Sequence, residues 1–314
     1  MQAAIQGELS SIIAEKIELV KSFQEEYGAS PLWVPVSGGK DSVAVWALAS
    51  SATRDYAVVF IHIPGQSHAD NVSTVYSVAD RLGVRDRMVV RVSKTRLIRD
   101  KLRQALESCG RPCLLHVIAY THRGEDYWSA MKRYGFPAPL GRFGKGTRWC
   151  CGVFKHRVLQ RLPYNGDRMG VPWKYGVNGV KATDSPYRAR KYKSDVQTWE
   201  KTRDTYLFPL RTLRDPQVWG ILEYYGLAGT VRLQYDKWGR SPNCMFCPML
   251  GKTRINRTAP ALPEPVKEKI AETLGELLPR YKPGTYSRRM IQLWLEAIGR
   301  QVTQGRPAGA LVED

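Results

Sequence analysis

Residues 32–49 read LWVPVSGGKDSVAVWALA. The apolar run at 32–36 predicts a strand, the stretch 37–42 a tight turn, and the apolar run at 43–49 a helix. Two adjacent glycines, Gly38 and Gly39, allow backbone amides to point into one concavity. The positive end of the helix and the charge of Lys40 add attraction for an anion. This stretch therefore predicts a phosphate-binding loop on an α/β scaffold.

An ordinary strand-to-helix turn would also use glycines, and this is the alternative interpretation of the loop. Two glycines instead of one, the lysine, and Asp41 at the helix start, where Mg²⁺ could sit, favour phosphate binding. The loop is not a Walker A motif, which needs Gly-x4-Gly-Lys-Ser/Thr. Residues 251–253 (GKT) match the end of that motif, but Phe246 stands at the position of its first glycine.

The chain around the loop alternates strands and helices. We expect a helix over 8–27 that stops at Gly28, a strand at 56–63 buried on both faces, a helix over 68–82 and a strand at 87–92. This alternation predicts a parallel sheet with right-handed crossovers. Further along we expect mostly helix over 98–134, helix over 153–162, a strand at 173–177, helix over 216–225, an irregular segment at 226–262 and two helices within 264–301.

The composition indicates a polyanionic partner. The 314 residues contain 48 Lys and Arg against 29 Asp and Glu, a net charge of +19. Basic residues concentrate at 142–148, 155–157 and 188–193, with aromatic residues nearby, which suits nucleic acid, although a merely basic surface is the alternative. No stretch resembles a secretory signal or a membrane span, so we expect a soluble, cytoplasmic protein with no membrane partner.

The six cysteines fall into three pairs. Cys244 and Cys247 form a CxxC motif, which needs two further thiolates to complete a four-coordinate site, and Cys150 and Cys151 can supply them. The adjacent pair favours an iron–sulfur cluster over structural zinc, while a redox CxxC or simple buried thiols are further alternatives. Six thiols without a secretory signal argue against a disulfide framework, and we expect Cys109 and Cys113 to be small buried apolar residues.

These motifs together resemble one superfamily. The segment SGGKDS after a first strand is similar to the PP-loop of the ATP pyrophosphatases, whose superfamily includes the phosphoadenosine phosphosulfate (PAPS) reductases. Four later stretches resemble family segments in the same order: Arg148-Trp149-Cys150 with Lys155, residues 179–185 with Arg188, residues 206–210 with Val218-Trp219, and residues 235–247. Lys181 and Asp184 stand where the family has Arg and Glu, and Lys lacks the bidentate fork of Arg.

The resemblance implies an α/β fold of the adenine nucleotide alpha hydrolase type. This fold has a parallel sheet, typically of five strands, with helices on both faces. In this chain we expect a small helical C-terminal region after it. We expect four segments: an N-terminal helix (1–29), the PP-loop domain (30–225), a cluster-binding CxxC segment (226–262) and a helical C-terminal region with a tail (263–314). The resemblance also implies a [4Fe-4S] cluster on the four cysteines at 150, 151, 244 and 247.

Family reductases that act on sulfonucleotides use a nucleophilic cysteine in a C-terminal segment, and no cysteine follows Cys247. The resemblance therefore implies an ATP-cleaving member. We expect an ATP pyrophosphatase, forming AMP and pyrophosphate, that adenylates a nucleic-acid oxygen for replacement by sulfur, as in Dnd-type and Ssp-type DNA phosphorothioation. Thiolation of a tRNA base, and reduction of PAPS or adenylylsulfate with a partner's thiol, are the alternatives. A non-catalytic nucleic-acid-binding module is disfavoured because Lys40 and Asp41 are both present.

The expected cofactors are ATP, Mg²⁺ and the [4Fe-4S] cluster, and the expected partners are DNA, in preference to tRNA, a sulfur-donor cysteine desulfurase and other modification-complex subunits. Lys40, Asp41 and Lys155 are the expected catalytic residues, with Asp41 also positioning Mg²⁺. The expected ATP and phosphate contacts are Ser37, Gly38, Gly39, Lys40, Asp41, Ser42, Arg148, Lys155, Lys181 and Arg188, with Asp184 orienting one of these cations.

Overall fold

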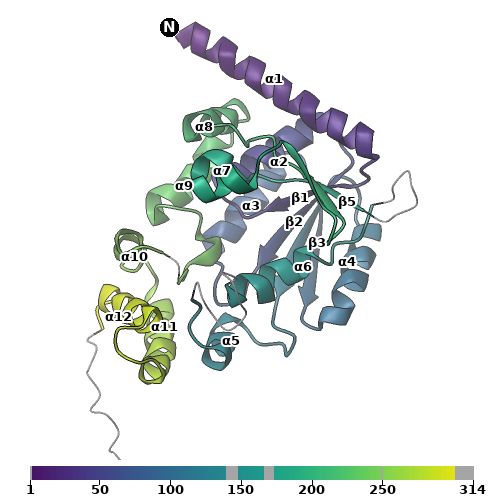
Figure 1. The fold of residues 1–314 in the computed structure, drawn as a ribbon. Coiled ribbons are helices and arrows are strands. Elements are labelled where there is room, and N and C mark those ends of the chain that lie inside the picture. The colour runs from purple at the N-terminus through teal and green to yellow at the C-terminus, as the bar shows by residue number, and fades with distance from the viewer. Residues whose placement is uncertain (1, 139–147, 166–172, 249, 301–314) are drawn as a thin grey trace, which may run out of the picture.

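The computed structural model describes residues 2–138, 148–165, 173–248 and 250–300, and Figure 1 shows their arrangement. The strands are β1 (Leu32–Val36), β2 (Tyr56–His62), β3 (Asp86–Val92), β4 (Cys113–Ala119), β5 (Lys174–Val177), β6 (Val196–Trp199) and β7 (Asp204–Leu207). The helices up to residue 159 are α1 (Gln2–Tyr27), α2 (Lys40–Ala52), α3 (Ala69–Arg81), α4 (Ile98–Glu107), α5 (Tyr127–Tyr134), the π-helix η2 (Cys151–His156) and α6 (Arg157–Leu159). The later helices are α7 (Pro186–Lys191), α8 (Asp215–Tyr224), α9 (Ala228–Trp238), α10 (Lys252–Thr258), α11 (Glu264–Leu277) and α12 (Tyr286–Ala297).

The strands form one sheet in the order β3-β4-β2-β1-β5-β7-β6. Every neighbouring pair is parallel except β6 and β7, which are antiparallel. From β1 the chain first builds the side that holds β2, β3 and β4, and then crosses to β5 on the other side. The gap beyond the carboxyl ends of β1 and β5 is therefore the switch point at which open α/β sheets bind ligands.

Apolar side chains cover both faces of the sheet. On β1, Trp33 packs into one core, while Leu32, Val34 and Val36 pack into the other. Helices α1, α2, α3, α8 and α9 contribute to the second core, and α4, α5, η2 and α6 contribute to the first. The α/β prediction, with helices on both faces of a parallel sheet, is confirmed, and the sheet is two strands larger than the five-stranded type expected.

The last three helices extend the core that contains Trp33. Figure 1 shows α10, α11 and α12 grouped beside α5, away from the sheet. Lys132 on α5 forms ion pairs of 2.6 Å with Glu272 and Glu276 on α11. The ring centres of Phe246 and Trp294, which lies on α12, are 4.5 Å apart. The predicted C-terminal helices are thus present and pack against the segment that carries the CxxC motif.

The sequence predictions of secondary structure were wrong in three places. Residues 98–134 are not mostly helix, because strand β4 lies between α4 and α5. Strands β6 and β7, which form the antiparallel pair at one edge of the sheet, were not predicted. The segment 226–262 is not irregular throughout, since it contains α9 and α10. Each strand that was missed pairs with a strand distant in sequence or lies at an edge of the sheet. In both situations the local sequence pattern says little about strand formation.

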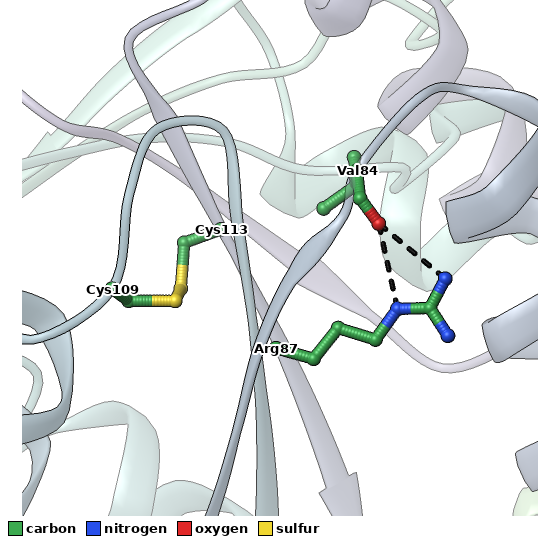
Figure 2. The surroundings of a disulfide bond; sticks show 4 residues. All are labelled: Val84, Arg87, Cys109 and Cys113. Carbon is green, nitrogen blue, oxygen red and sulfur yellow. Dashed lines mark hydrogen bonds between the residues drawn. A yellow bond between two sulfur atoms is a disulfide. The ribbon is translucent and has the colours of Figure 1, made fainter.

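Cys109 and Cys113 form a disulfide, so the expectation of two separate buried thiols was wrong (Figure 2). Helix α4 ends at Glu107, and the chain reverses through the cis Arg111–Pro112 bond into β4. The reversal brings the two Cα atoms to 5.9 Å, within the range that a disulfide spans. Both residues are buried.

Within the described ranges, none of the helices combines the length and the apolarity that crossing a lipid bilayer requires. Most of the basic segment predicted at 142–148, namely residues 142–147, lies outside the described residues. So do residues 301–314, the end of the predicted C-terminal region with its tail. The proposed boundaries of the four segments remain predictions.

Candidate active site at the switch point of the sheet

The loop between β1 and α2 requires a glycine at its first glycine position. Gly38 has a φ of +76°, which L-residues with side chains rarely adopt. A Cβ atom at Gly38 would also collide with the side-chain amide of Asn71 on α3, which is fully buried. That amide donates a hydrogen bond of 3.0 Å to the carbonyl of Ser37. The backbone of the loop is thus fitted closely to α3.

Two serines, one at each end of the loop, hold its ends together by hydrogen bonds. The hydroxyl of Ser42 accepts a hydrogen bond of 3.1 Å from the backbone N–H of Ser37 and donates one of 2.9 Å to the carbonyl of Gly39. The hydroxyls of Ser37 and Ser42 lie 3.1 Å apart. Gly39 is the N-cap of α2, and no side chain caps this helix end. The positive end of the helix dipole therefore faces the loop without a protein carboxylate as its cap.

A cavity of about 360 Å³ opens beside this loop. Its polar wall includes Ser37, Gly39, Asp41 and Ser42, and its apolar wall includes Pro35, Val36, Val59 and Ile61 from β1 and β2. Two cations, Lys155 and Arg188, also line it. Loop, apolar wall and cations together match a ligand that has phosphates at one end and an apolar ring at the other.

The second wall of the cavity follows β5. Asn178, Gly179 and Val180 line it directly after the strand. A Cβ at Gly179 would lie 2.6 Å from the carbonyl oxygen of Asp41, so only glycine allows the two backbones to approach this closely. The approach brings Lys181, two residues later, beneath the first turn of α2.

Two lysines and three carboxylates form an ion-pair network under the loop. Lys181 is 1% exposed and contacts Asp41 at 3.3 Å, Asp184 at 3.1 Å, and Asp215. Lys40 contacts Asp41 at 3.0 Å and Asp215 at 3.2 Å. Burial alone would lower the pKa of Lys181, but the hydrogen bond to Asp215 and the charges of Asp41 and Asp184 raise it above its usual value. Lys181 is therefore a permanent cation in this network.

Lys155 connects the cavity to the cysteines. It lies on η2, lines the cavity, and its Nζ atom donates a hydrogen bond of 3.1 Å to the sulfur of Cys244. Burial alone would lower the pKa of Lys155, but the neighbouring sulfur of Cys244 raises it. The ammonium group of Lys155 thus lies between a phosphate-type loop and a thiol.

The four cysteines outside the disulfide gather around a buried tyrosine. Cys150 is buried, and Cys151, Cys244 and Cys247 are half-buried. The hydroxyl of Tyr127 has its pKa raised well above the usual value by burial and then by the charges of all four thiols. Among the described residues, no group of three or more His, Cys, Asp or Glu has the geometry to hold a metal ion.

The adjacent cysteines differ in their environment. The hydrogen bond from Cys150 lowers the pKa of Cys151 to about 6, despite opposing burial, and the charges of Lys155 and Arg148 act in the same direction. The same contact raises the pKa of Cys150. One thiol of the pair therefore ionises far more readily than the other.

The structure brings most of the predicted site residues together. Ser37, Gly39, Asp41, Ser42, Lys155 and Arg188 line the cavity, and Gly38 shapes the loop. Lys40, Lys181 and Asp184 lie in the ion-pair network beside it. Arg148 is the exception, because its described contacts are on the cysteine side. The roles of all these residues toward ligands remain predictions.

Several residues that support the site were not predicted from the sequence. The hydroxyl of Tyr235 accepts a hydrogen bond of 3.1 Å from the backbone N–H of Lys40, and Gln234 donates one of 3.1 Å to the carbonyl of Gly38. Asn71 and Asp215 complete the support from α3 and α8. Tyr235 belongs to a motif noted in the sequence, whereas Asn71 and Gln234 carry no local signal.

Comparisons with known proteins give distant similarities. No family model matches the chain. An uncharacterised protein of Methanocaldococcus jannaschii is 23% identical over 288 residues, which cover 90% of this chain and 49% of that protein. The chain thus spans about half the length of the curated relative that it matches.

Two solved structures are also similar. A phosphoadenylyl-sulfate (PAPS) reductase from Candida auris, in a phosphate complex, has a TM-score of 0.39 and 13% identity over 70% of this chain and 87% of that chain. An NH3-dependent NAD synthetase from Campylobacter jejuni, in complex with a nitrate ion, has a TM-score of 0.40 and 11% identity over 92% of this chain and 94% of that chain. Similarities at this level assign neither a family nor an activity.

Proposed function

We propose that this chain is an ATP pyrophosphatase that adenylates an oxygen of a nucleic acid, so that sulfur can replace that oxygen. The DNA backbone is the acceptor we favour. One observation carries the proposal: Lys155 lines a cavity built on a phosphate-type loop and donates a hydrogen bond to Cys244, one of four gathered cysteines. A site for phosphates and a site for sulfur chemistry therefore adjoin.

The proposed first step is attack of the acceptor oxygen on the α-phosphorus of ATP. A bond forms from that oxygen to the phosphorus, and the bond to the bridging oxygen breaks with release of pyrophosphate. Backbone amides of Gly38 and Gly39 and the ammonium group of Lys40 would hold the departing pyrophosphate, since preorganised donors stabilise charge that grows on a leaving group. Val59 and Ile61 would contact the adenine.

In the second step a sulfur nucleophile displaces the adenylated oxygen, and AMP leaves with that oxygen. The sulfur would come from the persulfide of a cysteine desulfurase, released as sulfide by a thiol reductant that becomes a disulfide, and other modification subunits would present the acceptor. Lys155 and Arg188 line the cavity beyond the loop, where they would contact the phosphate of AMP or of the acceptor. The curated relative is twice as long as the matched region, so further domains and partners belong to the proposal and not to the findings.

Mg²⁺ fits the donors beside the loop. Mg²⁺ binds one or two carboxylates together with substrate phosphates, and Asp41 lines the cavity with such a carboxylate. When bound, the ion would neutralise charge on the phosphates. Asp41 is also paired with Lys40 and Lys181, so it is held in place before any ion binds.

The free cysteines match a [4Fe-4S] cluster in number and donor type, although no group among the described residues has the geometry of a formed metal site. Such clusters take four thiolates, and four thiols remain once Cys109 and Cys113 are in a disulfide. All four act electrostatically on the same buried hydroxyl, that of Tyr127. Cys150, Cys151, Cys244 and Cys247 would hold the cluster, which would supply an iron able to carry a reactive sulfur or, if fully ligated, an electrostatic and structural support.

The central test is product analysis with Mg²⁺ and ATP, with and without DNA and a sulfide donor. We expect AMP and pyrophosphate, lost in Lys40→Ala and retained in Lys269→Ala, which changes an exposed lysine on α11. Formation of ADP and phosphate, or no turnover under any condition, would contradict the proposal. Release of sulfite from a sulfonucleotide with a thiol reductant would instead support a reductase.

The cluster has its own test. Protein purified without oxygen should be brown and contain about four iron and four acid-labile sulfide atoms per chain. The double variant Cys244→Ser with Cys247→Ser should lose both, whereas the matched variant Cys109→Ser with Cys113→Ser should keep them. Colourless wild-type protein that carries zinc would remove the cluster from the proposal.

The acceptor can be identified in cells. Mass spectrometry of nucleotides from DNA and from tRNA, with and without the gene, should show a sulfur-containing DNA linkage that depends on the gene. A gene-dependent thiolated tRNA base, with unchanged DNA, would replace DNA by tRNA as the acceptor.

A further inference from the structure

A second cavity of about 250 Å³ adjoins the candidate ATP cavity. Pro35, Leu159 and Asn178 line both of them. The second cavity lies on the far side of the switch point, over β6 and β7. Apart from the three shared residues, it is lined by residues that do not line the candidate ATP cavity. A group bound there would lie next to ATP without occupying its site.

Four aromatic side chains form part of the wall of this second cavity. Tyr192, Trp199, Tyr206 and Phe208 line it. The ring centres of Trp199 and Tyr206 are 6.0 Å apart, those of Trp199 and Phe208 5.8 Å, and those of Tyr192 and Phe208 5.0 Å, all in edge-on arrangements. Tyr192 and Trp199 are half-buried, so their rings remain accessible. In each edge-on pair the edge of one ring covers a face of the other, and a planar group can stack on the accessible faces that are not covered in this way.

A glycine makes room for one of these rings. A Cβ at Gly176 on β5 would lie 2.6 Å from the Cε1 atom of Tyr206. The ring of Tyr206 therefore lies directly against the backbone of the neighbouring strand. Burial, followed by the charge of Asp204, raises the pKa of Tyr206, so this wall of the cavity is uncharged at neutral pH.

The cavity also contains a buried carboxylate. Asp204 is 8% exposed and lines the cavity. Its Oδ1 atom forms an ion pair of 2.8 Å with the Nζ atom of Lys174, which is 1% exposed. A carboxylate repels a phosphate and accepts hydrogen bonds from the amino groups of nucleobases. The cavity is therefore suited to a planar ring that carries an N–H donor.

Basic residues flank the aromatic cavity. Arg188, Arg190, Lys191 and Lys193 lie within six residues of sequence, immediately before the cavity-lining side chains of β6 and β7. The Nζ atom of Lys191 lies 5.4 Å from the ring centre of Tyr192, and Arg188 lines the ATP cavity. Cations beside stacking rings are the arrangement by which proteins hold single-stranded nucleic acid.

We propose that this aromatic cavity binds a nucleobase of the DNA acceptor strand. The base stacks on Trp199 and donates an amino hydrogen to Asp204, while its phosphates lie toward Arg188 and the ATP cavity. This proposal rests on the proposed function and gives the acceptor its binding site. The base must be unstacked to enter, so single-stranded DNA binds more tightly than duplex.

The first test measures the affinity for single-stranded DNA oligonucleotides. Stacking on an aromatic side chain accounts for roughly 5- to 150-fold in affinity per base. Trp199→Ala should weaken binding by about that factor and Trp199→Phe by less, whereas Tyr224→Ala, which removes an exposed ring on α8, should change nothing. Three results would overturn the proposal. They are equal DNA affinity for all variants, tighter binding of an RNA oligonucleotide that depends on Trp199, and a Trp199→Ala variant that loses affinity for ATP but keeps its affinity for DNA.

The second test needs no variant. An oligonucleotide that contains 5-iodocytosine is bound to wild-type protein and irradiated, and the cross-linked peptide is identified by mass spectrometry. Cross-links at Trp199, Tyr192 or Tyr206 are expected, and cross-links confined to other aromatic residues, or none in a complex that forms, would contradict the proposal.

The tests of the base site and the tests of the proposed function can fail independently. Formation of AMP and pyrophosphate with no role for Trp199 in DNA binding would overturn the base site alone. DNA binding that depends on Trp199, without pyrophosphate formation, would support the base site and contradict the proposed chemistry.

Discussion

Replacing Gly38 with alanine tests whether the β1–α2 loop has the close fit that an anion site needs. The substitution Gly38→Ala adds one methyl group at a φ of +76°, against the buried amide of Asn71. The methyl group and the amide cannot both remain where they are, so either the loop or the side chain of Asn71 must move.

The cost has two parts. A left-handed conformation of a residue with a Cβ costs about 1–2 kcal/mol. Displacing Asn71 also disturbs its hydrogen bonds of 3.0 Å to the carbonyl of Ser37 and 3.1 Å to the side chain of Gln234, each contributing about 1 kcal/mol. We therefore expect Gly38→Ala to lower the free energy of unfolding by about 3–4 kcal/mol.

A matched variant separates the two parts. Gly83 has nearly the same backbone conformation, with a φ of +69°, and a Cβ there would meet nothing within 4 Å. Gly83→Ala should therefore cost only the conformational part, about 1–2 kcal/mol. The free energy of unfolding of the two variants is measured by urea denaturation, and ATP affinity by calorimetry.

In the proposed function the loop is the anion site, so Gly38→Ala should weaken ATP binding at least about tenfold, whereas Gly83→Ala should leave it unchanged. Equal losses of stability in both variants, together with wild-type ATP affinity in Gly38→Ala, would refute the argument that Asn71 and the loop fit closely.

Three further predictions concern other parts of the molecule. Lys155→Met should lower the rate of pyrophosphate formation roughly 100- to 1,000-fold, as loss of one charged donor at a reacting phosphate does, with Lys155→Arg retaining more activity in the same product assay. Burial and the neighbouring His62 lower the pKa of His116 to about 4, so the unfolded chain takes up the proton first. Stability should therefore fall by about 3 kcal/mol as the pH drops from about 6.5 to 4, and denaturation of His116→Gln should lack this part of the dependence. The disulfide closes a short loop, so Cys109→Ser with Cys113→Ser should lower stability by about 2 kcal/mol, and a reductant should bring the wild type to the same value in thermal unfolding.

The fold could be predicted where local patterns and tertiary packing agree. The run 32–49 gave β1, the loop and α2 with their observed order, because an apolar strand, a glycine turn and an apolar helix each have their own local signal. Strand β4 was missed inside a stretch assigned to helix. It pairs with β2 on one side and with β3 on the other, and that pairing is decided by segments distant in sequence.

The candidate site could be predicted in its loop and not in its supports. Ser37 to Ser42 form a contiguous motif whose geometry follows from glycine and helix-end chemistry. Asn71 and Gln234 reach the same loop from α3 and α9, over 34 and 196 residues of sequence, and an asparagine or a glutamine on a helix has no pattern that reveals such a contact. The disulfide was missed for a related reason, because the turn that brings its cysteines together was assigned to helix.

The charges beneath the loop constrain how ATP could bind. Lys40, Lys155, Lys181 and Arg188 are cations in or beside the cavity, and Asp41, Asp184 and Asp215 oppose them, so the protein alone is close to neutral there. The several negative charges of ATP would exceed this balance unless a divalent ion accompanies the nucleotide. Lys181 cannot move toward the phosphates without losing its ion pairs with three carboxylates, whereas Lys40 can exchange Asp215 for a phosphate because Asp215 is largely exposed. In the proposed reaction the two lysines would therefore have different tasks: Lys181 would hold Asp41 at the edge of the cavity, and Lys40 would follow the departing pyrophosphate.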